Sequence, residues 1–264
     1  MNLFCHVSAD LLLAAIVAMA IFIGLSIVRW KIIPEQFSTC LNLLGAGILL
    51  SVALEAGLHA ARIIDHSIQL NNPIILNNPI IWQQVFISIV GLALGVMGIA
   101  FLDKGQGGKI TEEINPHKIA SLIAISIGCY NFAVGLTIEP CYKTMLGLET
   151  ISIIVFGFYS VIQGFTIAAP LIGRQVSWDQ LLALGFMGGG PAILGTLVAR
   201  RWFDPAIDLF FCFLALGILV FVVRKLLQLK FASFTLPSTI AVLAGFLLGI
   251  SAGLVEMVLV YNTY

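Results

Sequence analysis

The sequence predicts an all-α polytopic membrane protein, with eight transmembrane helices in a single domain that covers residues 1–264. Hydrophobic residues make up 60% of the chain and charged residues only 10%, whereas soluble domains carry about a quarter charged residues. Apolar windows close to the roughly 20 residues that cross a bilayer recur eight times along the chain. No stretch between them is long enough for a soluble domain, so the lipid bilayer is the first expected partner.

The first three spans are expected at about 9–29, 38–61 and 80–102. The first lacks the basic segment that opens a signal peptide and is long for one, so we predict a retained helix. The third follows a tandem repeat of Leu-Asn-Asn-Pro-Ile-Ile at 70–81, whose prolines and asparagines favour turns. This repeat predicts a loop.

The other five spans are expected at about 118–138, 149–173, 179–199, 206–225 and 236–260. The glycine-containing stretch 103–118 before them predicts a flexible loop. Gly245, Gly249 and Gly253 recur every four residues on the last span. Small residues at this spacing predict a close helix–helix contact.

Basic residues are distributed asymmetrically about the predicted spans. Nine of the 13 fall in loops on the side opposite the termini. The positive-inside rule therefore places both termini outside an inner or plasma membrane. Acidic residues gather near the other face: Asp10, Glu55, Asp65, Glu139, Glu149, Asp204, Asp208 and Glu256. They form either an acidic mouth that concentrates cations or merely solvated helix ends.

Several function classes are not expected. The net charge is zero and no long basic run is present, so nucleic acid is not a predicted partner. The five cysteines are scattered without a CxxC pair, so neither a disulfide framework nor a zinc knuckle is indicated. HExxH, GxSxG and nucleotide-binding motifs are missing from the sequence. We therefore expect neither an enzyme nor a cofactor.

An internal repeat indicates where a site would lie. Segments 130–138 and 159–167 match at Tyr, Gly, Thr and Ile with an offset of 29 residues. Consecutive spans run in opposite directions, so the match predicts an inverted repeat, where transporters commonly bind substrate near the midplane. The alternative is a pair of packing seams. The candidate substrate-binding residues are Tyr130, Asn131, Tyr159, Ser160 and Gln163.

The repeat resembles the paired signatures of the ZIP (Zrt/Irt-like) metal transporters. Tyr-Asn-x-x-Val-Gly-Leu at 130–136 and Tyr-Ser-x-x-Gln-Gly-Phe at 159–165 are similar to that family's fourth and fifth helices. Segments 45–50, 189–191 and 215–223 are similar to its second, sixth and seventh. The resemblance extends from about residue 40 to the end. It implies an eight-helix bundle with inverted repeats and an elevator-like movement of four helices.

Most of the metal ligands that the resemblance implies are replaced. Tyr130 and Tyr159 stand where the family has His, Val134, Gln163 and Gly190 stand where it has Glu, and Asn131 keeps the family residue. Neutral oxygens do not offset a dication in a low-dielectric bundle. We therefore predict that the zinc site of the family is not functional here.

Glu55 and His59 form a second candidate for metal binding. They are four residues apart on the second span, so they share a helix face. With a third ligand, for which Glu256 is a candidate, they would hold one cation. The alternative is a local Glu–His ion pair near the interface.

The sequence thus predicts a transporter of the ZIP fold that moves a divalent metal cation, or an altered small solute, through a degenerate midplane site. The alternative is a non-transporting relative that binds, senses or assembles. A homodimer is left open.

Overall fold

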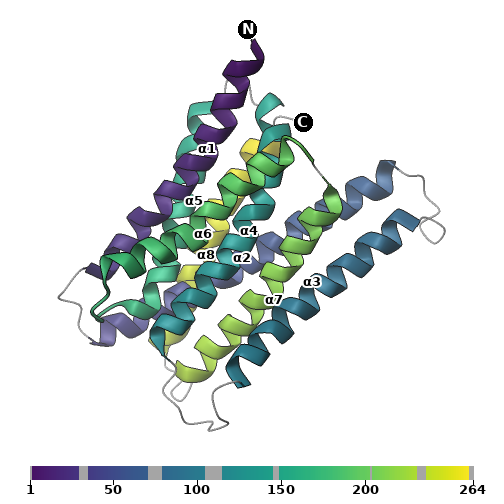
Figure 1. Ribbon diagram of the computed structural model, residues 1–264. Coiled ribbons are helices and arrows are strands. Elements are labelled where there is room, and N and C mark those ends of the chain that lie inside the picture. The colour runs from purple at the N-terminus through teal and green to yellow at the C-terminus, as the bar shows by residue number, and fades with distance from the viewer. Residues whose placement is uncertain are drawn as a thin grey trace.

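The structure is a computed structural model that describes residues 2–29, 35–70, 79–104, 115–144, 149–202, 204–230 and 236–261, with side chains over somewhat shorter stretches. These residues form an all-α bundle of eight α-helices and two short 3₁₀ segments (Figure 1). In order, the elements are α1 (Asn2–Leu25), η1 (Ser26–Arg29), α2 (Glu35–Leu70), α3 (Pro79–Lys104), α4 (Pro116–Thr144), α5 (Glu149–Ala168), η3 (Ala169–Leu171), α6 (Trp178–Ala199), α7 (Pro205–Lys230) and α8 (Leu236–Tyr261).

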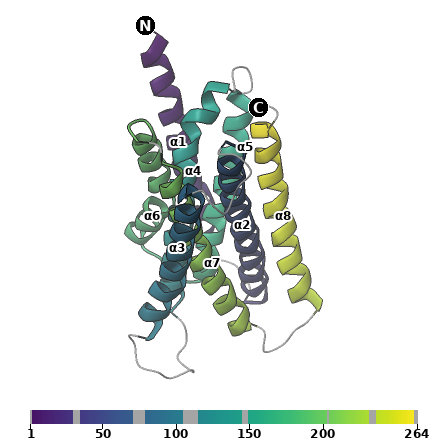
Figure 2. The same ribbon diagram turned by 90° about the vertical axis from the view of Figure 1, so that its right-hand side faces the viewer.

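Each of the eight helices overlaps one expected span, but α1 begins at Asn2, before its expected start, and α2 and α4 continue to Leu70 and Thr144, past their expected ends. Six of them are long and apolar enough to cross a membrane: α1 with η1, α2, α3, α4, α6 and α7. The described apolar parts of α5 with η3 and of α8 are shorter, Phe156–Leu171 and Thr239–Leu254. The chain is therefore a polytopic helical membrane protein with six candidate spans, and its two ends lie toward the same end of the bundle (Figure 2).

Local sequence explains where several helices begin. Pro79, Pro116 and Pro205 each occupy the first position of a helix, where the missing N–H has no partner to lose. Ser177 and Gln180 form a capping box at the start of α6, each side chain accepting a hydrogen bond from the backbone N–H of the other. Beside this cap, the Arg29 guanidinium lies 4.2 Å from the ring centre of Trp178.

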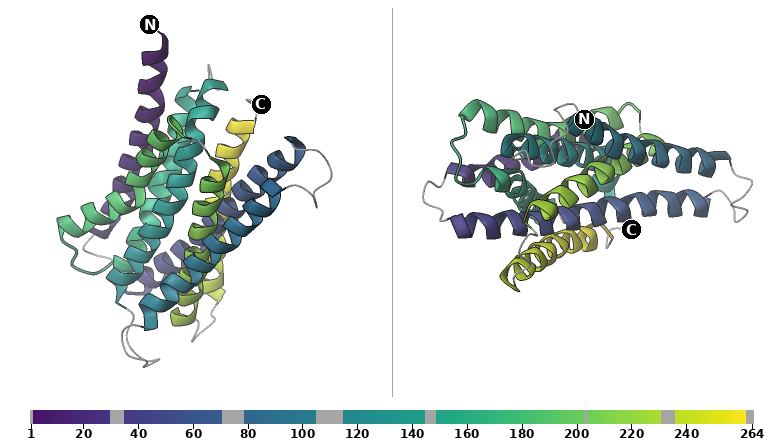
Figure 3. Two further views of the ribbon diagram at one scale, coloured as in Figure 1. Left: turned by 45° about the vertical axis from the view of Figure 1, so that its right-hand side comes forward. Right: turned by 90° about the horizontal axis from the view of Figure 1, so that it is seen from below.

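The helices divide into two groups of four. Within the first group α4 packs on α6, and α1 packs on both α5 and α6. Within the second, α2 packs on α8 and on α7, while α3 runs alongside α7 (Figure 1). The view from below in Figure 3 shows α8 lying along α2. The groups meet chiefly where α4 contacts α7, with smaller contacts of α5 to α8 and α2.

Four of these helix pairs approach each other through a glycine on each helix. At each of these glycines a Cβ would overlap the backbone of the partner helix, so only glycine permits the approach. The glycines are Gly24 and Gly164 for α1–α5, Gly195 and Gly135 for α6–α4, Gly47 and Gly245 for α2–α8, and Gly217 and Gly95 for α7–α3. The small-residue spacing on the last span therefore does mark a helix contact: Gly249 faces Ser51 and Gly253 faces Glu55.

The outside of the bundle is apolar. Large side chains that point outward include Met19, Phe86, Phe186 and Leu247, which is how a helix surface meets lipid. The main core forms between the two groups, around Ile48, Ile123 and Leu219. Polar side chains buried within this interior carry the candidate sites.

Candidate metal and substrate sites

Asn131 of α4 and Gln163 of α5 form a buried amide pair. The Asn131 Nδ2 donates to Gln163 Oε1 at 3.0 Å and to the Gly188 carbonyl of α6 at 2.9 Å. Asn131 is 3% exposed and Gln163 1%. The sequence placed both residues in one site, and the structure brings them together. Gln163 Nε2 is buried without a hydrogen-bond partner, so the pair keeps one unused donor.

The other three predicted binding residues have different surroundings. The Tyr159 hydroxyl donates to Glu55 Oε2 of α2. The Ser160 hydroxyl donates to the carbonyl of Phe156 on its own helix at 2.9 Å. Tyr130 is buried in the main hydrophobic core. Tyr159 therefore links α5 to α2. The Ser160 hydroxyl donates its hydrogen bond within α5 and not to the amide pair.

Glu55 and His59 contact different helices although they share one face of α2. Glu55 Oε2 accepts the Tyr159 hydroxyl, while Glu55 Oε1 is buried without a hydrogen-bond partner. His59 instead contacts Asp208 of α7. Glu256, the candidate third ligand, lies outside the residues whose side chains are described.

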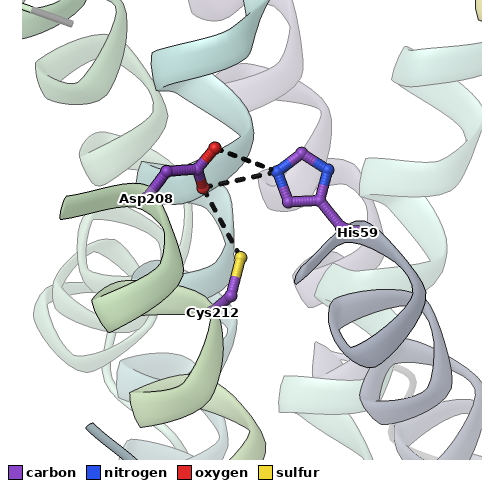
Figure 4. Close-up of side chains that lie close together, drawn as sticks. All are labelled: His59, Asp208 and Cys212. Atoms are coloured by element: carbon purple, nitrogen blue, oxygen red, sulfur yellow. Dashed lines mark hydrogen bonds and ion pairs between the residues drawn. The ribbon is translucent and has the colours of Figure 1, made fainter. Parts of the chain in front are cut away.

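His59, Asp208 and Cys212 form a compact cluster, here termed the triad (Figure 4). His59 Nε2 lies 3.2 Å and 3.3 Å from the two Asp208 carboxylate oxygens. The Cys212 thiol donates to Asp208 Oδ1 at 3.5 Å. One ligand atom from each residue lies within 4.8 Å of the other two. Among the described residues, these three could therefore hold a metal ion.

Burial sets the electrostatics of the triad. The Asp208 side chain is 0% exposed and His59 is 18% exposed, while Cys212 lies in a small apolar cluster with Ala60, Ala133 and Leu209. Taking a carboxylate out of water is costly unless a partner or cation offsets its charge. His59 contacts both oxygens of this carboxylate, and its partial exposure leaves one approach to the cluster.

Sequence reasoning found one member of the triad and missed the other two as ligands. Asp208 was predicted only as part of the acidic face, and Cys212 only as one of the scattered cysteines. Their spacing of four residues on one helix face is a signal that was available. His59 lies 149 positions before Asp208 in the chain, so no local spacing connects it with the other two residues.

Comparisons of this chain with models of known protein families and with characterised proteins find no match.

Proposed function

We propose that this polytopic membrane protein is a transporter with a ZIP-like arrangement of helices that moves a divalent metal cation between its two helix groups. The observation that carries the proposal is a line of polar side chains that runs from half-buried residues of α2 to buried residues of α5 and α4. We call it the polar route, and its members are His59, Glu55, Tyr159, Gln163 and Asn131.

Each step of the polar route is a contact or a helical neighbourhood. His59 and Glu55 are one turn apart on α2, and Tyr159 and Gln163 are one turn apart on α5. The Tyr159–Glu55 hydrogen bond joins the two helices, and the Asn131–Gln163 bond continues to α4. Polar side chains at membrane depth are costly and tend to mark ion pathways. The route therefore suits passage of a polar solute.

The glycine contacts support an inverted-repeat architecture. Exchanging α1 with α6, α2 with α7, α3 with α8 and α4 with α5 maps the α1–α5 glycine contact onto α6–α4, and the α2–α8 contact onto α7–α3. Gly135 and Gly164 are also equivalent in the sequence repeat. Such symmetry is common in transporters that alternate access by moving one group against the other, which is the elevator-like shift that the resemblance implies.

When its carboxyl group is ionised, Glu55 gives the route a negative charge that the neutral midplane residues lack. The amide pair and the two tyrosines offer only neutral oxygens in this setting. A carboxylate linked to Tyr159, with its second oxygen buried and without a hydrogen-bond partner, offsets part of the charge of a passing cation. This charge is the reason that we favour a divalent metal cation as the substrate.

The test is flux into liposomes that contain the purified chain and a metal-sensitive dye, with Zn²⁺, Mn²⁺ and Co²⁺ as substrates. We expect Glu55→Gln and Gln163→Met to lower the flux at least about tenfold, which corresponds to about 1.4 kcal/mol in the barrier. Gln84→Met is the matched control. Gln84 is buried on α3, and the hydrogen bond that its side chain donates goes to Ser67. Absence of flux for every metal would contradict the proposal.

The second candidate is a non-transporting protein that binds, senses or assembles, and one observation favours it. All five predicted binding residues are buried, with none more than 5% exposed. A static protein would keep them closed. Reaction of a Gln163→Cys variant with a water-soluble thiol reagent, in a background without native cysteines, separates the two candidates. A transporter is expected to expose this position intermittently, whereas a static protein would leave it unreacted.

A further inference from the structure

We propose that the triad of His59, Asp208 and Cys212 is a binding site for one zinc-class dication, with a fourth coordination position open to water. The site goes beyond the transport route proposed above. It shares His59 with that route, but Asp208 and Cys212 lie outside the route, and the site would exist in a protein that transports nothing.

The spacing of the ligand atoms suits tetrahedral coordination. Zinc bonds of about 2.0–2.3 Å to N, O and S place neighbouring ligands roughly 3.3–3.8 Å apart in a tetrahedron. Asp208 Oδ1 lies 3.3 Å from His59 Nε2 and 3.5 Å from Cys212 Sγ. His59 Nε2 and Cys212 Sγ are no more than 4.8 Å apart. Closing the cluster around an ion therefore requires a movement of about 1 Å at most.

The charges of the ligands balance a dication. When the metal binds, Cys212 loses its thiol proton to solvent and the sulfur forms the metal bond. One thiolate, one carboxylate and one neutral imidazole then carry two negative charges, so the bound ion forms a neutral unit. Neutrality matters because Asp208 and Cys212 are almost fully buried and an uncompensated charge there is costly.

The ligand types select the class of metal. A thiolate and an imidazole favour Zn²⁺, Co²⁺ and Cd²⁺, whereas Mg²⁺ and Ca²⁺ prefer oxygen ligands. Three protein ligands with a fourth position for water are typical of zinc sites that exchange a ligand, whereas structural zinc sites are closed by four protein ligands. His59 is the one partly exposed member, so the open position faces its side of the cluster.

The structural alternative is a buried ion pair that ties α2 to α7, with the thiol as a hydrogen-bond donor and no affinity for metal. The two readings differ in what Co²⁺ does. In the metal site, Co²⁺ gives a thiolate-to-cobalt charge-transfer band and the intense visible bands of tetrahedral coordination, and Zn²⁺ removes both. In the ion pair, the Cys212 sulfur stays protonated and no such band appears.

The experiment titrates the full chain in detergent micelles with Co²⁺ and then with Zn²⁺, followed by absorption and calorimetry. We expect one ion per chain, release of at least the thiol proton, and no competition from excess Mg²⁺ or Ca²⁺. Cys212→Ser should abolish the charge-transfer band, and Asp208→Asn and His59→Gln should each weaken zinc binding at least about 100-fold, since even residues that only support ligands change affinity 10–100-fold.

Matched controls are Cys129→Ser, a half-buried cysteine on α4, and His66→Gln, an exposed histidine further along α2. Both should bind zinc as the unaltered chain does. The site is overturned if the unaltered chain shows no thiolate–cobalt band, a result that needs no variant to fold, or if Cys212→Ser keeps it. Metal binding at the triad without flux would contradict only the transport proposal. Flux without metal binding at the triad would contradict only the proposed metal site.

Discussion

Asn131 holds together three helices of the first group through a single amide. Its two N–H bonds reach Gln163 on α5 and the Gly188 carbonyl on α6. Hydrogen bonds between membrane helices average about 0.6 kcal/mol, but a buried polar group left without any partner costs about 1–3 kcal/mol. The cost of about 1–3 kcal/mol applies here, because Gln163 Nε2 has no hydrogen-bond partner even in the intact protein.

Asn131→Leu is therefore expected to destabilise the protein by about 1–3 kcal/mol, because it leaves the Gln163 side chain buried without its donor. Equilibrium unfolding in mixed detergent measures the change. Ser160→Ala is the control in the neighbouring helix. Its hydroxyl donates a hydrogen bond to the Phe156 carbonyl in the same helix. The free energy of unfolding is therefore expected to change by no more than about 0.5 kcal/mol. Equal losses in the two variants would contradict the special role of Asn131.

Cys212 tests the triad through stability as well as spectroscopy. A ligand that binds only the folded state at 100 times its dissociation constant stabilises it by about 2.7 kcal/mol. Zinc at that concentration is expected to raise the melting temperature of the unaltered chain and of Cys129→Ser. Zinc should leave the melting temperature of Cys212→Ser unchanged. A zinc-induced shift of the same size in all three proteins would place the metal elsewhere.

At the scale of the helix, glycine contacts decide which helices touch. α5 carries two glycines of the repeat region with opposite surroundings. A Cβ at Gly164 would overlap the backbone of Ile21 on α1, whereas a Cβ at Gly157 would meet no atom within 4 Å. The same substitution on one helix thus separates the packing effect from helix propensity.

Gly164→Ala is expected to cost at least about 1–3 kcal/mol, because α1 and α5 must move apart to admit the methyl group. Gly157→Ala should be neutral or stabilising by up to about 1 kcal/mol, the intrinsic preference of a helix for alanine over glycine. Thermal unfolding of the two variants in the same detergent gives the comparison. Similar melting temperatures would show that the α1–α5 crossing is looser than the structure has it.

At the scale of the whole molecule, the distribution of charges predicts an orientation in the membrane. Gln175 precedes α6 and Arg201 follows it, both exposed and at opposite ends of a membrane-long helix. Because the predicted loop around Arg174 belongs to the positive side, we predict that Gln175 lies inside the cell and Arg201 outside.

Labelling with a membrane-impermeant maleimide checks this orientation in a chain without native cysteines. Arg201→Cys is expected to react in intact cells, and Gln175→Cys only after permeabilisation. The reverse pattern would invert the predicted topology, and labelling of both from outside would contradict a spanning α6.

The eight helices follow from the sequence because the signal for each is local. Hydropathy over about 20 residues, proline at Pro79, Pro116 and Pro205, and the Ser177–Gln180 cap are all readable within one segment. Asn131 and Gln163, which the structure pairs, were also predicted to share a site, because the sequence match between segments 130–138 and 159–167 includes both residues. The pairing of glycines across helices was not, since one helix shows which residues are small but not which backbone they meet.

The triad shows the limit most clearly. Asp208 and Cys212 share a face of α7, a relation that a spacing of four residues fixes before any folding. Their contact with His59 depends on how α2 packs against α7. In the same way, Glu55 bonds Tyr159 and does not share a site with His59, because α2 also packs against α5. Helices form from contacts between near neighbours in the chain, whereas sites form from contacts that only helix packing creates.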